Sequence, residues 1–208
     1  FPTQRRMDGV RIPTLDSVFD LARHAAYPGV RFNIETKLSP LAPGDAPLPD
    51  AFARALIASV RAAGMQDRVT VQSSDWRTLA TVQREAGEIG TVYLSAQRDW
   101  LDNIGAGQAA GSPWTAGVRH SDHGSVPRMV KAAGGRVWSP YFGDLTRDLV
   151  VQAKSLGLKV IAWTVNDRAD MGRLIDWHVD GMITDYPDLL REVLGERNLP
   201  LPPAGFRQ

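Results

Sequence analysis

The sequence predicts an α/β fold in which a parallel sheet is covered by helices. Three observations carry this prediction. Strand-like and helix-like segments alternate six times along the 208 residues, and no hairpin signal separates them. No GxGxxG or P-loop pattern follows the first strand, which disfavours an open nucleotide-binding sheet. Polar and aromatic residues gather at the carboxyl ends of the strands, where a TIM (β/α)8 barrel carries its site. We therefore expect a barrel.

The first half of the chain predicts three strands and two helices. In order, these are strand 31–37, helix 51–64, strand 68–75, a helix from Trp76 to about Ala86, and strand 91–96. Apolar residues fall at helical spacing in 51–64, and Gly64 is well placed to end that helix. A loop from about Arg98 to Ser125, rich in Gly, Ala, Ser and Asp, interrupts the rhythm.

The second half continues the alternation. The expected elements are helix 126–134, strand 136–141, helix 146–157, strand 158–166, helix 169–178, strand 180–187 and a helix beginning near Pro187. Thr146 can cap its helix and Gly157 can end it. A complete barrel has eight units and about 250 residues. With about six units in 208 residues, we expect one incomplete barrel domain over 1–208 that lacks its first two units.

Composition narrows the possible partners and chemistry. The net charge of +1 gives no long-range attraction to nucleic acid. The absence of cysteine excludes disulfides, thiolate metal sites and a cysteine nucleophile. No run approaches the roughly 20 apolar residues of a membrane span. The first residues resemble neither a signal peptide nor a natural start, so we expect the cut end of a longer chain.

The stretch FNIETK, residues 32–37, places unusual charges in an apolar strand. Alternate residues of a strand share a face, so Asn33, Glu35 and Lys37 are expected to point the same way. The simplest interpretation is a salt bridge at a strand end. A functional one is that Glu35 binds a hard cation while Lys37 binds a phosphate or carboxylate. A third is that Lys37 forms a Schiff base.

Six segments in this order resemble the glycerophosphodiester phosphodiesterase family, most closely its exported bacterial branch. They are IPTLDSVFDLA (12–22), FNIETKLSP (32–40), VTVQSSDWRTL (69–79), VWSPYFGDLT (137–146), GLKVIAWTVND (157–167) and VDGMITDYPDLL (179–190). The resemblance covers about 12–190, and residues 191–208 are expected to form a helix end and an extended tail. It implies a TIM barrel that uses a divalent cation, Ca²⁺ or Mg²⁺, to hydrolyse glycerophosphodiesters to an alcohol and glycerol 3-phosphate.

The resemblance also implies roles for individual residues. Glu35 resembles the family's metal-ligating glutamate, and Lys37 resembles its phosphate-contacting lysine. Trp163 resembles the aromatic wall of the pocket. For substrate contact we add Gln72, Ser73 and Tyr141, which lie where strands reach the cavity, whereas Trp138 is expected to pack in the core.

The sequence also departs from the family pattern. The family's opening His-Arg-Gly strand, Glu-x-Asp pair and following His-Asp, which supply both catalytic histidines and most metal ligands, are not present. His178 stands where the family commonly has Gly. His120 and His123 have a spacing that could suit a metal, although a solvated loop pair is the simpler interpretation. His24 is expected on a helix surface near Pro28. The catalytic residues therefore stay unknown, and we expect the 208 residues to be inactive alone.

Two alternatives to a phosphodiesterase stay open. One is a non-catalytic relic of the barrel that binds an anion or a partner. The other is a Schiff-base lyase that uses Lys37, which would ignore five of the six matching segments. The expected partner is a small-molecule substrate, with self-association possible through exposed strand edges. The resemblance to the exported branch suggests a periplasmic or secreted location.

Overall fold

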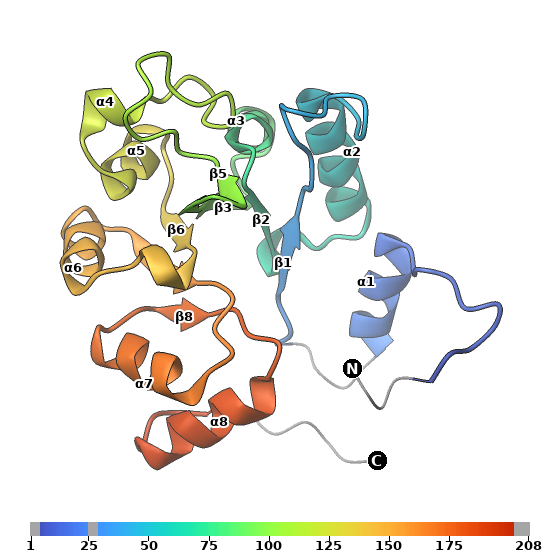
Figure 1. The fold of residues 1–208 in the computed structure, drawn as a ribbon. Coiled ribbons are helices and arrows are strands. Elements are labelled where there is room, and N and C mark those ends of the chain that lie inside the picture. Colours follow the sequence, from blue (N-terminus) through green and yellow to red (C-terminus); the bar gives the residue numbers. More distant parts are fainter. Residues whose placement is uncertain (1–4, 25–28, 202–208) are drawn as a thin grey trace.

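The computed structural model describes residues 5–24 and 29–201, and within them six parallel strands curl into an incomplete barrel (Figure 1). The strand order is β1-β2-β3-β6-β7-β8, and every neighbouring pair is parallel. Helices α2 to α8 lie outside the strands in Figure 1. The predicted fold class, an incomplete TIM-type barrel, is confirmed.

The element boundaries are close to those expected from the sequence. The sheet contains β1 (Phe32–Glu35), β2 (Val69–Ser73), β3 (Gly90–Ser95), β6 (Val137–Pro140), β7 (Lys159–Ala162) and β8 (Gly181–Met182). The helices are α1 (Leu15–His24), α2 (Pro49–Ala62), α3 (Trp76–Glu85), α4 (His120–His123), α5 (Val126–Ala132), α6 (Arg147–Ser155), α7 (Arg168–Asp176) and α8 (Pro187–Glu196). The expected end of the first helix near Pro28 lies outside the described residues.

The residues predicted to begin and end two of these helices do so in the structure. Thr146 accepts a hydrogen bond from the backbone N–H of Leu149 at 3.2 Å and so caps α6. Gly64 follows α2 with a φ of +63°, a left-handed conformation that glycine adopts without steric cost. His178 has a φ of +62° after α7. The same left-handed requirement explains why glycine suits position 178.

Three features differ from the sequence prediction. The segment from about Arg98 to Ser125 was expected to be a loop, but it begins with an antiparallel hairpin of β4 (Gln97–Arg98) and β5 (Leu101–Asp102). The same segment also contains the short helix α4. The last strand was expected over 180–187, whereas β8 spans only two residues. Among the described residues β8 pairs only with β7. It is short because no second strand hydrogen-bonds to its other edge in this part of the chain.

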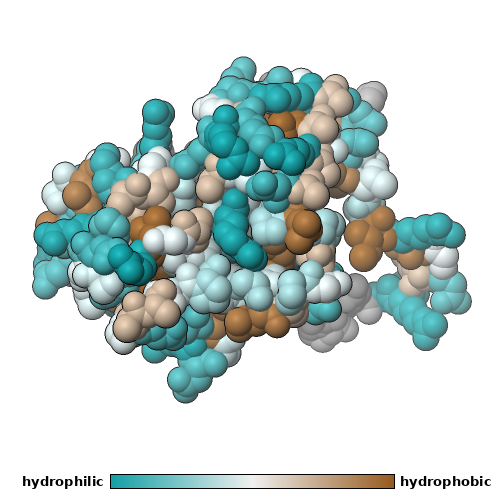
Figure 2. All heavy atoms as spheres, turned by 90° about the horizontal axis from the view of Figure 1, so that it is seen from above, coloured by the Kyte–Doolittle hydropathy of each residue, from teal (hydrophilic) through white to brown (hydrophobic). Residues whose placement is uncertain are grey.

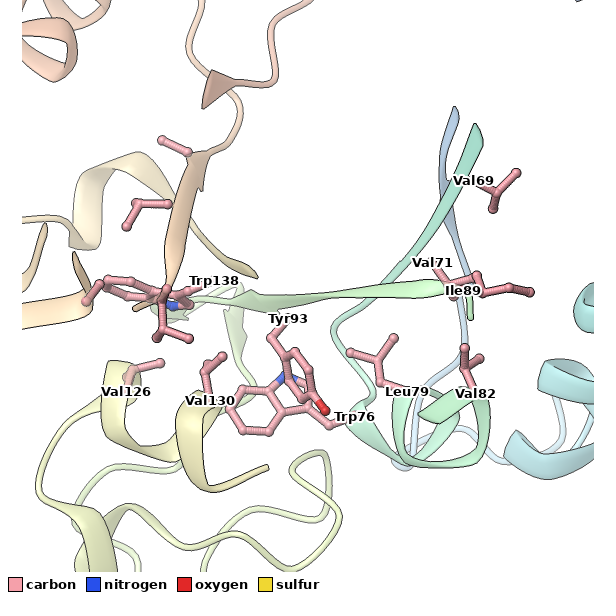
Figure 3. Close-up of a cluster of buried hydrophobic side chains, with 14 of the residues drawn as sticks. Val69, Val71, Trp76, Leu79, Val82, Ile89, Tyr93, Val126, Val130 and Trp138 are labelled. Carbon is pink, nitrogen blue, oxygen red and sulfur yellow. The ribbon is translucent and has the colours of Figure 1, made fainter. Parts of the chain in front are cut away.

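The hydrophobic core lies between the sheet and the outer helices. Trp76, Tyr93 and Trp138 are among its largest buried side chains, and Figure 3 shows them close to Val126 and Val130 of α5. The ring of Trp76 meets that of Tyr93 edge to face, with centroids 5.0 Å apart. The expectation that Trp138 packs in the core is confirmed, since its exposed fraction is 2%.

The barrel is open on one side, and the beginning of the chain extends away from the sheet. In the described part, β1 and β8 each pair with a single strand, so the barrel is open between them. The segment before α1 projects from the body of the molecule (Figure 2). Its side chains Met7, Val10 and Ile12 are exposed. Among the described helices, none is long and apolar enough to cross a membrane.

Candidate active site

Glu35 and Lys37 project into one cavity at the carboxyl end of β1. The Nζ atom of Lys37 lies 2.9 Å from Oε1 of Glu35. Thr36, between them, points the other way, is buried, and shares a hydrogen bond with Thr78 of α3 at 2.9 Å. The strand alternation predicted for residues 32–37 is therefore confirmed, and it places both charged groups on the inner side of the sheet.

The two charged side chains border two adjoining cavities. One has a volume of about 290 Å³ and is also lined by Gln72, Ser74, Trp100 and Trp163, among others. The other, of about 350 Å³, lies toward the loop after β1 and is lined by Ser39 and Asp45 as well. The pair thus lies at the carboxyl ends of the strands, where a TIM barrel carries its site.

Gln72 and Ser73 were both expected to reach the cavity, and the structure separates them. Gln72 lines the cavity, and its Oε1 accepts a hydrogen bond from Nδ2 of Asn33 at 2.7 Å. Ser73 is fully buried on the opposite side, where its Oγ donates to the carbonyl oxygen of Thr36 at 2.8 Å. The alternation of β2 causes this difference and brings Ser74 to the cavity instead. Ser73 therefore supports the loop after Glu35 from outside the cavity.

The Ser74 segment is held on both sides. Its carbonyl oxygen accepts a hydrogen bond from Nδ2 of the buried Asn103 at 2.9 Å. The next residue, Asp75, caps α3 by accepting from the N–H of Arg77 at 3.1 Å. Asp75 also accepts from the Arg77 side chain, and this hydrogen bond raises the pKa of the Arg77 guanidinium. The segment that presents Ser74 is therefore firmly positioned.

Aromatic side chains form the other end of the cavity. Trp163 and Trp100 both line it, and their ring centroids lie 6.0 Å apart. Tyr141 contacts both rings, with centroid distances of 5.7 Å to Trp163 and 5.2 Å to Trp100, but it is not among the lining residues. Tyr141 was expected to touch substrate. The structure instead packs Tyr141 against both tryptophans, and Trp100 from the β4–β5 hairpin lines the cavity beside Trp163.

Sequence reasoning missed Trp100, which lies in the segment expected to be a loop. The residue occupies the turn of the β4–β5 hairpin. A large aromatic within a stretch of Gly, Ala, Ser and Asp was the available signal. Its place over the cavity depends on contacts with a distant part of the chain, which sequence spacing does not reveal.

Those contacts come from the turn after β6. Asp144 forms an ion pair with Arg98 at 2.7 Å, and its other oxygen accepts from the N–H of Gln97 at 2.8 Å. The Arg98 guanidinium lies over the Tyr141 ring, 5.3 Å from its centroid. A Cβ at Gly143 would lie 2.6 Å from the Tyr141 ring and 2.9 Å from Arg98, so only glycine fits without displacement.

The histidines do not converge on this site. His120 and His123 lie on the four-residue helix α4, and neither is among the residues that line the two cavities. Of His24 the structure describes only the backbone, at the end of α1. Asp185 accepts from Nδ2 of Asn166 at 2.8 Å, which fixes the turn before α8. The Asp185 contact fits a structural role.

A family model and several relatives place this chain in one family. A model of the glycerophosphoryl diester phosphodiesterase family matches residues 1–189. A glycerophosphodiester phosphodiesterase of Bacillus subtilis is 28% identical over 192 residues, which cover 89% of this chain and 55% of that protein. The crystal structure of a putative glycerophosphoryl diester phosphodiesterase from Silicibacter pomeroyi is 31% identical with a TM-score of 0.78, covering 97% of this chain and 62% of that one.

More distant structures share the fold. An Oleispira antarctica phosphodiesterase, solved in complex with sn-glycerol-3-phosphate, has a TM-score of 0.64 at 18% identity, covering 88% of this chain and 62% of that one. The chain thus spans between half and two thirds of the length of these relatives.

The family is generally dependent on a divalent metal, and the residues present offer little to hold one. Ca²⁺ takes six to eight oxygen ligands, and Mg²⁺ takes six. Glu35 supplies a carboxylate that Lys37 already engages, and Asp45 lines only the neighbouring cavity. Within residues 5–24 and 29–201, no cluster of three or more His, Asp or Glu could hold a metal ion. The described residues therefore do not form a metal centre by themselves.

Proposed function

This chain belongs to the glycerophosphoryl diester phosphodiesterase family, and from that premise we propose that it binds the phosphate of a glycerophosphodiester at Lys37. The whole protein would hydrolyse the diester to an alcohol and glycerol 3-phosphate. The observation that carries the proposal is the convergence of Lys37, Glu35, Gln72 and Trp163 on one cavity.

The cavity divides into two ends that suit the two parts of such a substrate. Lys37 supplies a positive charge with three N–H donors, and Gln72 and Ser74 add polar groups beside it. Trp163 and Trp100 offer apolar surface at the other end. In this arrangement the phosphate lies at the β1 and β2 end and an organic group lies against the tryptophans.

Proton transfer is the part of the reaction for which the described residues provide no group. Hydrolysis needs an acid to protonate the leaving alcohol and a base to activate the attacking oxygen. No histidine is among the described residues that line the two cavities, and Glu35 is engaged by Lys37. We therefore propose that residues 1–208 alone bind the substrate without turning it over.

The test combines binding and turnover. Calorimetry should detect binding of glycerol 3-phosphate to the chain, and an assay with glycerophosphodiesters and Ca²⁺ should detect negligible hydrolysis. Turnover comparable to that of a longer relative would contradict the inactivity. Absence of glycerol 3-phosphate binding would remove the proposal and with it the non-catalytic anion-binding alternative.

The role of Glu35 as a metal ligand is tested separately with Glu35→Gln. In metal-free buffer, removal of the carboxylate should strengthen glycerol 3-phosphate binding, because a negative charge near the anion is lost. With Ca²⁺ or Mg²⁺ present, the same substitution should weaken binding if Glu35 ligates the ion. An effect that does not change with metal would show that Glu35 only pairs with Lys37.

The open side of the barrel supports a proposal of self-association. In the described part, β1 and β8 each carry one unpaired edge, and such edges tend to pair with other chains. Light scattering should show dimers or larger species, and a stable monomer would count against the idea.

A periplasmic or secreted location, suggested by the exported-branch resemblance, would be tested by cell fractionation.

A further inference from the structure

A further cavity lies at the amino ends of the strands. Its volume is about 790 Å³, which exceeds that of either cavity beside Glu35 and Lys37. It is lined by residues at or next to the beginnings of β1, β2, β3, β6 and β7. Because all these strands run parallel, the cavity is at the opposite end of the sheet from Glu35 and Lys37. It therefore needs an explanation of its own.

Positive charge gathers around this amino-end cavity. Arg31 directly precedes β1, Arg136 directly precedes β6, and Lys159 is the first residue of β7. Among the described lining residues Glu88 is the one acidic side chain, and it is paired with Arg61 at 2.7 Å. The cavity therefore carries an excess of positive charge, which attracts anions.

The three cationic side chains have no partners of their own. In the part of the chain that the structure describes, Arg31, Arg136 and Lys159 form no ion pair and no side-chain hydrogen bond. On a neighbouring surface, by contrast, Arg54 is paired with Glu85 at 2.9 Å. All three cations are exposed, so water screens their mutual repulsion and leaves their donors free to reach a ligand.

The positive charges lie on two sides of the cavity. Arg136 and Lys159 are neighbours, since the backbone N–H of Lys159 donates to the carbonyl oxygen of Arg136 at 2.9 Å. Arg31 is on β1, which β2 and β3 separate from β6. With about 4.8 Å between adjacent strands, these three steps span at most about 14 Å, and less in a curled sheet. A single phosphate can engage one side, whereas an anion with several phosphate groups can engage both.

Small and polar residues keep the cavity open between these two sides. Four of the lining residues are glycines, which contribute no side chain: Gly87, Gly90, Gly134 and Gly157. A Cβ at Gly90 would lie 3.1 Å from the Thr70 methyl group, so a larger residue would crowd this part of the lining. Thr70, Gln83 and Thr91 add polar surface. The lining thus suits a charged, hydrated ligand better than an apolar one.

From these observations we propose that the amino-end cavity binds a small soluble polyphosphate, an anion with at least two phosphate groups. Arg31 holds one end of the anion, and Arg136 and Lys159 hold the other. A guanidinium suits this ligand because its fork of N–H donors can bind two phosphate oxygens at once. The proposal does not depend on phosphate binding at Lys37.

The first experiment titrates the chain with inorganic tripolyphosphate. Calorimetry should show binding at least about 10-fold tighter than that of orthophosphate, because the longer anion reaches both sides of the cavity. The affinity should fall as the salt concentration rises. In NMR spectra of the same titration, the amide signals of Gly90 and Gly134 should shift, which locates the anion at the amino ends of the strands.

Three variants assign the contacts. Arg136→Gln and Lys159→Gln should each weaken tripolyphosphate binding by roughly 10-fold, since each removes a charge-assisted hydrogen bond. Arg147→Gln is the matched control, because it removes the same charge from an exposed residue at the start of α6, outside the cavity. Its affinity should equal that of the unmodified chain. Urea unfolding should show that all three variants remain folded.

The proposal is overturned if tripolyphosphate does not bind, or binds no more tightly than orthophosphate. Equal weakening by Arg147→Gln would reveal a general charge effect and would also overturn it. Signal shifts confined to Ser74 and its neighbours would place the anion at Lys37 instead, with the same consequence. Glycerol 3-phosphate binding is measured separately, so failure of the proposed function and failure of this site are distinguishable.

Discussion

The Nζ atom of Lys37 and the Oε1 atom of Glu35 lie 2.9 Å apart, yet the two side chains differ in exposure, 80% for Lys37 and 25% for Glu35. Exposed ion pairs contribute only about 0–1 kcal/mol to stability. The pair is therefore a weak contributor to folding. Because the pair lines a cavity, it suits ligand binding better than stabilisation of the fold. The mostly exposed ammonium of Lys37 can turn toward an incoming phosphate.

The first prediction follows from that difference. Lys37→Gln should change the free energy of unfolding by less than about 1 kcal/mol. It should weaken glycerol 3-phosphate binding by roughly 10-fold to 100-fold, because a charge-assisted hydrogen bond is lost. Urea unfolding and calorimetry measure the two effects. Lys131→Gln on the exposed side of α5 is the control, and an equal loss of binding there would point to a general charge effect.

The second prediction concerns the neighbouring serines. Ser73→Ala should destabilise the fold by about 1 kcal/mol, since the buried carbonyl oxygen of Thr36 loses its donor. Ligand affinity should change little. Ser74→Ala should have the opposite profile, with near-normal stability and weaker glycerol 3-phosphate binding. If Ser73→Ala impaired binding more than Ser74→Ala, the assignment of faces on β2 would be wrong.

The third prediction concerns Asp75, whose side chain is fully buried and paired with Arg77. Asp75→Ala removes the cap of α3 together with that ion pair. The expected loss of stability is about 2–4 kcal/mol, measured by thermal or chemical unfolding. Arg77→Ala leaves the carboxylate buried without its partner, and it should also be strongly destabilising. A loss below about 0.5 kcal/mol in both variants would contradict this account of the segment before α3.

The fourth prediction is a loss of stability at high pH. Burial raises the pKa of Tyr93 from 10.0 to about 12, because the charged phenolate is poorly solvated in the core. The unfolded chain therefore releases this proton first. The stability that depends on it is fully present below about pH 10 and is lost as the pH rises toward 12, by about 2–3 kcal/mol in total.

The test of this pH dependence compares unfolding free energies between pH 9 and 12 for the unmodified chain and Tyr93→Phe. The variant loses the hydrogen bond to the carbonyl oxygen of Ala133, 2.9 Å away, and should start somewhat less stable. Its stability should then fall less steeply with pH. Parallel curves would show that other groups cause the alkaline transition.

The sequence by itself determined the features that depend on local geometry. The alternation of a strand put Glu35 and Lys37 on one face, the capping residue Thr146 began α6, and Gly64 ended α2. Repeated strand–helix alternation predicted the parallel sheet, and the polar residues at the strand ends favoured a barrel over an open sheet. The same alternation along β2 puts Ser73 on the opposite face from Gln72. The prediction that both residues reach the cavity was wrong because it did not apply this alternation to β2.

Only the tertiary structure decided that Trp100, and not Tyr141, lines the cavity beside Trp163. The ion pair between Asp144 and Arg98 fixes the hairpin, and this hairpin places Trp100 against the Tyr141 ring and in the lining of the cavity. These residues lie on separate segments of the chain, and no short-range periodicity relates them. Their arrangement depends on how the ends of β3 and β6 meet in the curled sheet, which is a property of long-range packing.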